Sequence, residues 1–274
     1  MDIPLYLKAI VLGILEGATE FLPISSTGHL IIANDLLSFT GERAKTFDIF
    51  IQLGAICAIV WHYRQRITRV SGSLFSDPAA FRFALNVLIG FLPAALLGLF
   101  LHKTIKTQLF NPITVAGALI LGGLVILLIE SRRRTHHVEH VDELTWHVAL
   151  KVGLAQSLAL FPGVSRAGAT IMGGLLSGMS RSVATEFSFF LAIPTMFAAT
   201  FYDLYKNLDI MRPEDLEMLA AGFVAAFFSA WLVIRALLAF VARHSFKAFA
   251  WYRILFGSLV LVYFLSTTGL TVSL

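Results

Sequence analysis

The sequence is poor in charge. Only 14% of its 274 residues are Asp, Glu, Lys or Arg, whereas 57% are hydrophobic and the mean hydropathy is +0.80. A soluble domain carries about 25% charged residues, so this shortage argues against a water-soluble globule and a disordered chain. The single cysteine, Cys57, excludes a disulfide scaffold. The net charge of +4 is too small and too scattered for a nucleic-acid-binding surface. The composition predicts an integral membrane protein with no nucleic-acid partner.

Six apolar runs are long enough to be membrane spans, each of which needs about 20 mostly apolar residues. They are Phe47–Tyr63, Phe83–His102, Pro112–Ile129, Phe187–Tyr202, Leu219–Val241 and Phe249–Leu265. The sequence therefore predicts an all-α, polytopic membrane protein that forms a single domain over residues 1–274.

Two further apolar regions are interrupted. Leu5–Leu22 runs into Pro23 and a polar stretch before the short run Leu30–Leu37, and Val148–Phe161 precedes a similar break before Ala169–Leu176. The second run of each pair is too short to cross a hydrocarbon core of ~30 Å. Broken helices at membrane depth occur where protein or a wet cavity surrounds them. Each region is predicted to be a re-entrant helix–loop–helix hairpin; a full first arm with an interfacial second arm is the alternative.

The two halves of the chain, approximately 1–135 and 145–274, resemble each other. Matching positions are Glu16 and Gln156, Phe21 and Phe161, Ser25 and Ser165, and Gly28 and Gly168. Each half holds one hairpin followed by three spans. Because a hairpin returns to its starting side and three spans do not, the second half enters the membrane from the opposite face. This predicts an inverted repeat, with the site near the midplane where the broken helices meet.

The distribution of basic residues predicts the orientation. On this topology one side carries the larger number of Lys and Arg residues, Arg253 among them. The positive-inside bias places that side in the cytoplasm. Both termini and the mouth of the first hairpin are then expected to face outward.

Two carboxylates interrupt the first apolar run. Glu16 and Glu20 are four residues apart, so both point from one face of a helix. Ionisable groups at membrane depth are functional candidates, and paired oxygens at this spacing suit a hard divalent cation such as Mg²⁺ or Ca²⁺. The alternative is a helix nearer the interface with both groups hydrated.

A dense polar loop follows Pro23. It contains Ser25, Ser26, Thr27 and His29. Hydroxyls beside an imidazole are the components of an activated nucleophile, and the pKa of histidine suits proton transfer near neutrality. The alternative is that the hydroxyls only cap a short helix that begins near Gly28.

The second broken loop contributes a cation. Arg166 follows Ser165, with Gly163 and Gly168 nearby. A guanidinium group matches phosphate oxygens, and glycines let backbone N–H groups approach an anion at a helix start. Thr170 adds a hydroxyl one turn later. The alternative partner for Arg166 is a carboxylate of the first hairpin, in a structural ion pair.

Two long motifs carry a resemblance to a known family. Residues 16–29, EGATEFLPISSTGH, and residues 162–170, PGVSRAGAT, resemble the two signatures of the bacterial undecaprenyl-diphosphate phosphatases, the bacitracin-resistance family. The similarity extends to Lys45-Thr46-Phe47, Phe110-Asn111-Pro112-Ile113, Glu186-Phe187-Ser188-Phe189 and Asp203-Leu204-Tyr205-Lys206. One departure is Ala167, where the family usually has a second serine.

The resemblance implies an activity and a location. The family hydrolyses undecaprenyl diphosphate to undecaprenyl phosphate and inorganic phosphate, which recycles the lipid carrier for peptidoglycan and other envelope polymers and confers bacitracin resistance. It depends on a divalent metal ion. It lies in the bacterial plasma membrane, surrounded by membrane lipid, with its site open to the outer side. A homodimer is left open.

The resemblance also suggests roles for the candidate residues. Glu16 and Glu20 are expected to hold the metal, and Arg166 to clamp the diphosphate. Ser26 is the preferred nucleophile, with His29 as proton acceptor, although attack by a metal-activated water or by His29 itself stays open. The residues expected to bind phosphate are Ser25, Thr27, Ser165, Arg166, Gly168 and Thr170. The competing function is a secondary transporter or lipid flippase, since inverted repeats and broken helices are transporter features.

Overall fold

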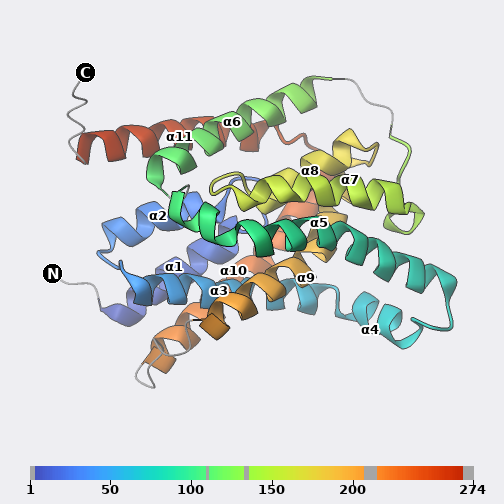
Figure 1. Ribbon diagram of the computed structural model, residues 1–274, viewed down its shortest axis with the longest axis horizontal. Helices are drawn as coiled ribbons and strands as arrows, with labels where there is room; N and C mark the ends of the chain where they lie inside the picture. Colours follow the sequence, from blue (N-terminus) through green and yellow to red (C-terminus); the bar gives the residue numbers. More distant parts are fainter. Residues whose placement is uncertain (1–3, 109–110, 133–135, 207–214, 268–274) are drawn as a thin grey trace.

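The computed structural model describes residues 4–108, 111–132, 136–206 and 215–267, so Phe110 of the matching segments lies outside it. Its elements are α1 (Leu5–Thr19), α2 (Ser26–Leu36), α3 (Glu42–His62), α4 (Arg64–Gly72), α5 (Pro78–Gln108), α6 (Pro112–Ser131), η1 (Val141–Glu143), α7 (Trp146–Gln156), η2 (Ser157–Leu160), α8 (Arg166–Leu176), α9 (Arg181–Lys206), α10 (Leu216–Val241) and α11 (Lys247–Thr267). The all-α prediction is confirmed (Figure 1).

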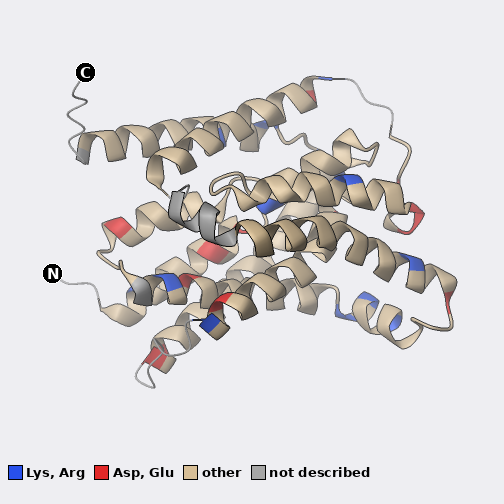
Figure 2. Ribbon diagram, in the orientation of Figure 1, with Lys and Arg blue, Asp and Glu red and all other residues tan. Residues whose placement is uncertain are grey.

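Six helices are long and apolar enough to cross a membrane, as predicted. They are α3, α5, α6, α9, α10 and α11, and each contains or largely overlaps one of the predicted runs. Most of their ribbon carries no charged residue (Figure 2). Pro93 in α5 and Pro194 in α9 lie inside long helices, a position that kinks a helix because proline lacks the N–H donor.

The two interrupted regions form pairs of short helices, α1 with α2 and α7–η2 with α8. Their second helices begin earlier than predicted, at Ser26 and Arg166. The motif residues thus occupy first helical turns, and the prediction of polar loops there is wrong. The physical reason is a sharp turn at the preceding serine, because Ser25 and Ser165 have φ of 70° and 71°. Re-entry of these pairs into the membrane stays a prediction.

Helix packing relates the two halves of the chain. The first short helix of each half packs on a long helix of the other half: α1 on α10, and α7 on α5. Both contacts are close, since a Cβ on Gly13 of α1 would collide with the carbonyl oxygen of Gly222. A Cβ on Gly153 of α7 would lie 2.5 Å from the carbonyl oxygen of Gly90 in α5. Small residues let helix backbones approach in this way. The exchange of partners agrees with a repeat, whose inverted topology stays a prediction.

The remaining helices surround these contacts. Helix α3 lies between α10 and α9, and α6 packs along α11, at the top of the view in Figure 1. The turn after α1 also lies against α9, where the rings of Phe21 and Phe189 meet edge to face at 5.6 Å. Long helices therefore cover one side of the two pairs of short helices, whereas Val11 of α1 and Leu154 of α7 stay exposed.

We predict that Gly13→Ala destabilises the protein by about 1–3 kcal/mol, the usual cost of overpacking, because the new Cβ meets backbone of α10 rather than a movable side chain. Gly117→Ala on α6 is the matched control, since nothing lies within 4 Å of its added Cβ. Thermal unfolding in detergent measures both. Equal melting temperatures for the two variants would contradict the close α1–α10 contact.

Candidate active site

One cavity of about 460 Å³ lies where the two pairs of short helices meet α5 and α9. Its polar lining residues are Glu20, Ser25, Ser26, Thr27, Gln52, Gln156, Ser165, Arg166, Thr195 and Tyr202. Most of its apolar lining comes from α5, η2 and α9. A cavity of this size with a few convergent polar groups is a typical ligand site.

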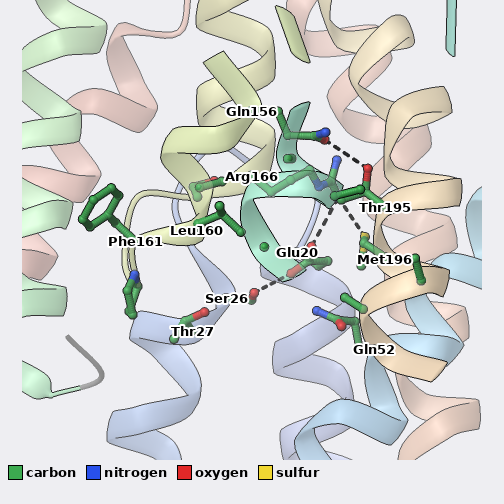
Figure 3. Close-up of a pocket in the computed structure, with 18 of the residues that line it drawn as sticks. Glu20, Ser26, Thr27, Gln52, Gln156, Leu160, Phe161, Arg166, Thr195 and Met196 are labelled. Atoms are coloured by element: carbon green, nitrogen blue, oxygen red, sulfur yellow. Dashed lines mark hydrogen bonds and ion pairs between the residues drawn. The ribbon is translucent and has the colours of Figure 1, made fainter. Parts of the chain in front are cut away.

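Glu20 joins the two halves of the chain inside this cavity. Its Oε2 accepts a 2.5 Å hydrogen bond from Ser26 Oγ, and its Oε1 lies 3.2 Å from Arg166 Nη2. Figure 3 shows Glu20 between these two partners. Glu20 and Ser26 are each 8% exposed, and the side chain of Arg166 is 10% exposed. The ion pair that the sequence left as an alternative therefore forms in this structure.

Arg166 is held by several further contacts. Its Nη1 donates to the carbonyl and hydroxyl oxygens of Ser188 at 3.2 and 3.5 Å, and Nη2 lies 3.1 Å from Met196 Sδ. Its guanidinium carbon lies 5.6 Å from the centre of the Phe21 ring. Within the described residues, its buried Nε–H has no hydrogen-bond partner. The side chain is thus fixed in place and keeps one free donor.

The serines before the short helices differ in what their hydroxyls do. Ser165 Oγ caps α8 by accepting a 3.1 Å hydrogen bond from the Gly168 backbone N–H. Ser25 has the same backbone conformation before α2 but makes no such bond. Both serines and Thr27 line the cavity, where the structure brings them together with Glu20, Ser26 and Arg166.

Four predicted site residues do not line the cavity: Glu16, His29, Gly168 and Thr170. Thr170 is fully buried, and its hydroxyl contacts the Ser188 hydroxyl at 2.6 Å and the Arg166 carbonyl oxygen at 2.9 Å. The Gly168 N–H is used by the cap of α8. His29 lies behind the cavity wall. Their roles in binding or catalysis stay predictions, and Thr170 supports the backbone of Arg166 in this structure.

His29 is fixed by contacts on both ring nitrogens. Nδ1 lies 2.7 Å from the Ser25 carbonyl oxygen, and Nε2 lies 2.7 Å from the Tyr252 hydroxyl. Because a carbonyl oxygen only accepts, Nδ1 carries the proton, so Nε2 of the neutral ring accepts from Tyr252. The ring also stacks on Phe256 at 4.2 Å. The structure therefore joins Ser26 to Glu20 rather than to His29.

Glu16 lies one turn before Glu20 and is 1% exposed. Its Oε2 is buried with no hydrogen-bond partner among the described residues. The same residues contain no group of three or more His, Cys, Asp and Glu side chains that could hold a metal alone. A cation here would need ligand oxygens from the substrate as well as Glu16 and Glu20.

Four polar residues in the cavity wall were not among the predicted site residues: Gln52, Gln156, Thr195 and Tyr202. Thr195 Oγ1 donates to Gln156 Oε1 at 3.3 Å, and Gln52 Oε1 accepts from Thr200 at 3.1 Å (Figure 3). Gln156 is the repeat partner of Glu16, which was a usable signal. Gln52 and Thr195 are isolated polar residues within apolar runs, a weaker signal of a lined cavity.

Arg253 was assigned by the sequence to the cytoplasmic charges, and that assignment is wrong. It is 1% exposed, and its guanidinium contacts backbone carbonyls of both interrupted regions. Its position near the start of an apolar run suggested a helix end in water, but α11 begins six residues earlier, at Lys247.

Known proteins resemble this chain along most of its length. The family model described as Bacitracin resistance protein BacA matches residues 9–259. The undecaprenyl-diphosphatase of Nitrosospira multiformis is 60% identical over 262 residues, which cover 96% of each chain. Those of Aromatoleum aromaticum and Dechloromonas aromatica are 57% and 58% identical over 261 residues, covering 95% of each chain.

We predict that Ser165→Ala lowers the free energy of unfolding by about 1 kcal/mol, the usual cost of removing a helix cap. Ser25→Ala is the matched control, because it has the same backbone conformation without a cap bond. Thermal unfolding in detergent, rather than activity, is the measurement, since both serines line the cavity. A larger loss in Ser25→Ala would refute this account of the cap.

Proposed function

The chain belongs to the bacitracin resistance protein BacA family, and from this premise we propose that it hydrolyses undecaprenyl diphosphate to undecaprenyl phosphate and inorganic phosphate. The reaction returns the lipid carrier to the synthesis of peptidoglycan and other envelope polymers, and it confers bacitracin resistance. The observation that carries the proposal is the cavity in which Arg166, Glu20 and Ser26 meet beside an apolar wall.

The cavity suits both parts of such a lipid. The hydroxyls of Ser25, Thr27 and Ser165 are donors for the diphosphate beside Arg166. The wall formed by Ala95 and Leu99 of α5, among other apolar residues, offers contact for the start of a prenyl chain. Polar groups that orient a ligand within a mainly apolar cavity are the usual basis of specificity.

Arg166 is the main group for the diphosphate. Its Nε–H is free among the described residues, and its Nη2 contact with Glu20 is 3.2 Å long. A guanidinium offers donors in a fork that matches phosphate oxygens. Arg166 would therefore bind the diphosphate without leaving Ser188, and it would neutralise the charge that develops on the leaving phosphate.

Ser26 is the proposed nucleophile. Its Oγ attacks the terminal phosphorus, the bond from that phosphorus to the bridging oxygen breaks, and undecaprenyl phosphate leaves with the bond's electron pair. The Ser26 proton passes to Glu20 Oε2, its partner at 2.5 Å. Water then attacks the phosphorus of the phosphoserine, the bond from phosphorus to Ser26 Oγ breaks, and Oγ takes its proton back from Glu20 as inorganic phosphate leaves. In this scheme Glu20 takes the proton that the sequence assigned to His29, and His29 holds the Ser25 carbonyl in place.

A divalent cation, Mg²⁺ or Ca²⁺, is the proposed cofactor. The buried Oε2 of Glu16, which has no hydrogen-bond partner among the residues that the structure describes, fits this group, as does the carboxylate of Glu20 at the next turn. Mg²⁺ is commonly held by one or two carboxylates together with substrate phosphates. When bound, the cation would neutralise charge on the diphosphate.

We further propose that the protein lies in the bacterial plasma membrane with the cavity open to the outer side. The cavity lies toward the C-terminal ends of the α5 and α9 spans, as Leu99 and Tyr202 in its lining indicate. The positive-inside bias places those ends outside. One chain supplies the carboxylates, hydroxyls and guanidinium by itself, so the proposed site does not require a homodimer.

We predict that the protein, purified in detergent, releases phosphate from undecaprenyl diphosphate. Arg166→Ala should lower kcat/KM by about 10²–10⁴-fold, as losses of charge-stabilising groups do, whereas Arg69→Ala on the exposed α4 should not. Chelation with EDTA should stop release, and Mg²⁺ or Ca²⁺ should restore it.

Rates in this assay are expressed per folded molecule, because breaking a buried ion pair costs about 3–5 kcal/mol of stability. Detergent removes the sealed compartment, so a transporter or flippase without hydrolytic activity would release no phosphate. That result would overturn the proposal. Full activity in EDTA would overturn only the proposal of a metal cofactor and would leave the proposed hydrolysis intact.

We predict that rapid acid quenching of the reaction with ³²P-labelled substrate traps phosphate on Ser26. Ser26→Ala should abolish the labelled species, while Thr27→Ala, which alters a neighbouring cavity hydroxyl, should retain it. Mass spectrometry of the labelled peptide locates the phosphate. A phosphohistidine at His29 would transfer the nucleophilic role to that residue.

A further inference from the structure

Arg253 of α11 is a buried cation whose hydrogen-bond partners among the described residues are all backbone oxygens. Its five guanidinium N–H groups donate to five carbonyl oxygens, at 3.0–3.2 Å: Leu119, Pro23, Val164, Ala118 and Gly163. A guanidinium has five such donors, so all of them are used. None of the ion pairs found among the described residues includes Arg253.

A buried charge without a carboxylate is costly unless hydrogen bonds compensate for lost hydration. The fold provides a space for this one. A Cβ on Gly122 of α6 would collide with the guanidinium and would lie 2.6 Å from its Cζ. A Cβ on Gly168 of α8 would lie 3.2 Å from Nη1. The absence of these two side chains lets Arg253 reach between α6 and the two turns.

The five carbonyls lie in three separate segments. Pro23 is in the turn before Ser25 and Ser26, and Gly163 and Val164 are in the turn before Ser165 and Arg166. The other two carbonyls belong to α6. Arg253 thus ties both turns to one helix and to each other. It does not line the cavity itself.

The direction of these carbonyls also matters for an anionic ligand. The oxygens of Pro23, Gly163 and Val164 carry the negative ends of peptide dipoles, and they point at Arg253. Their negative charge is therefore directed at a cation. A diphosphate in the cavity would gain from this arrangement, because carbonyl oxygens facing it would repel it.

We propose that Arg253 is a positioning residue that sets the separation of the two turns and thereby holds Ser26 and Arg166 in register for the reaction. The inference rests on the proposed hydrolysis for its catalytic consequence. The structural part of the inference, that Arg253 sets the separation of the two turns, needs only the five hydrogen bonds. A displacement of about 1 Å between reacting groups can lower a rate on the order of 10²-fold.

Two substitutions test the proposal by different means. Arg253→Lys keeps the charge but has three donors on one nitrogen, which cannot reach both turns and α6 together. Gly122→Ala leaves Arg253 intact and displaces its guanidinium. Both should lower kcat by about 10–10²-fold per folded molecule, with little change in KM. Gly117→Ala, on the same helix with open space around it, should match the wild type.

The double variant Arg253→Lys/Gly122→Ala separates this account from general damage. The smaller lysine head leaves room for the added methyl group, so the double variant should be no slower than Arg253→Lys alone. Additive losses would indicate two independent packing defects and would overturn the proposal. So would wild-type kcat per folded molecule in either single variant.

A second measurement does not depend on the reaction. Spin labels on Leu36→Cys and Leu176→Cys, in a Cys57→Ser background, report the separation of the exposed ends of α2 and α8. Arg253→Lys and Gly122→Ala should shift or broaden the distance distribution, and Gly117→Ala should not. An unchanged distribution would overturn the proposal even in an active enzyme. If the two variants change the distance distribution but the wild-type protein releases no phosphate, the positioning role of Arg253 is supported and the proposed hydrolysis is refuted.

Discussion

The contact between Glu20 and Arg166 is the interaction on which the rest of the site depends. It joins two residues that are 146 positions apart, one from each interrupted region, at a distance of 3.2 Å. Only 14% of the residues in this protein are charged. Separating two buried charges leaves each uncompensated, so the pair holds the two halves together at the cavity. A guanidinium cation and a base for Ser26 are thereby held next to each other in the wall of the cavity.

A second constraint comes from behind the cavity. Arg253 has no carboxylate partner in the part of the chain that the structure describes, and five carbonyl dipoles face its charge. The protein therefore holds the guanidinium of Arg166 on the Glu20 carboxylate and that of Arg253 on backbone carbonyls, while Glu16 Oε2 has no hydrogen-bond partner among the described residues. The Arg166 guanidinium suits the diphosphate of the proposed reaction, and the Glu16 oxygen suits the proposed cation.

Hydropathy was sufficient to predict the six spans and the two interruptions, because apolar length and turn-forming residues are local properties. It was also sufficient to bring Glu20, Ser26 and Arg166 into consideration, since charge within an apolar run is costly and therefore informative. It could not predict that Thr170 and His29 turn away from the cavity or that Arg253 turns inward. Those directions are set by partners distant in sequence, Ser188, Tyr252 and the carbonyls of two turns.

The two halves share a backbone but differ in chemistry. Ser25 and Ser165 have nearly the same φ, and a short helix follows each of them. The first half then adds the carboxylate of Glu20 to the cavity wall and buries Glu16 one turn earlier, whereas the second half has the neutral Gln156 at the position that matches Glu16 and adds Arg166. A repeated fold alone is compatible with transport or catalysis, because function resides in the site and not in the fold. Here the asymmetry of charge across the repeat provides a base and a cation on facing turns, which hydrolysis of a diphosphate requires and passive passage of a lipid does not.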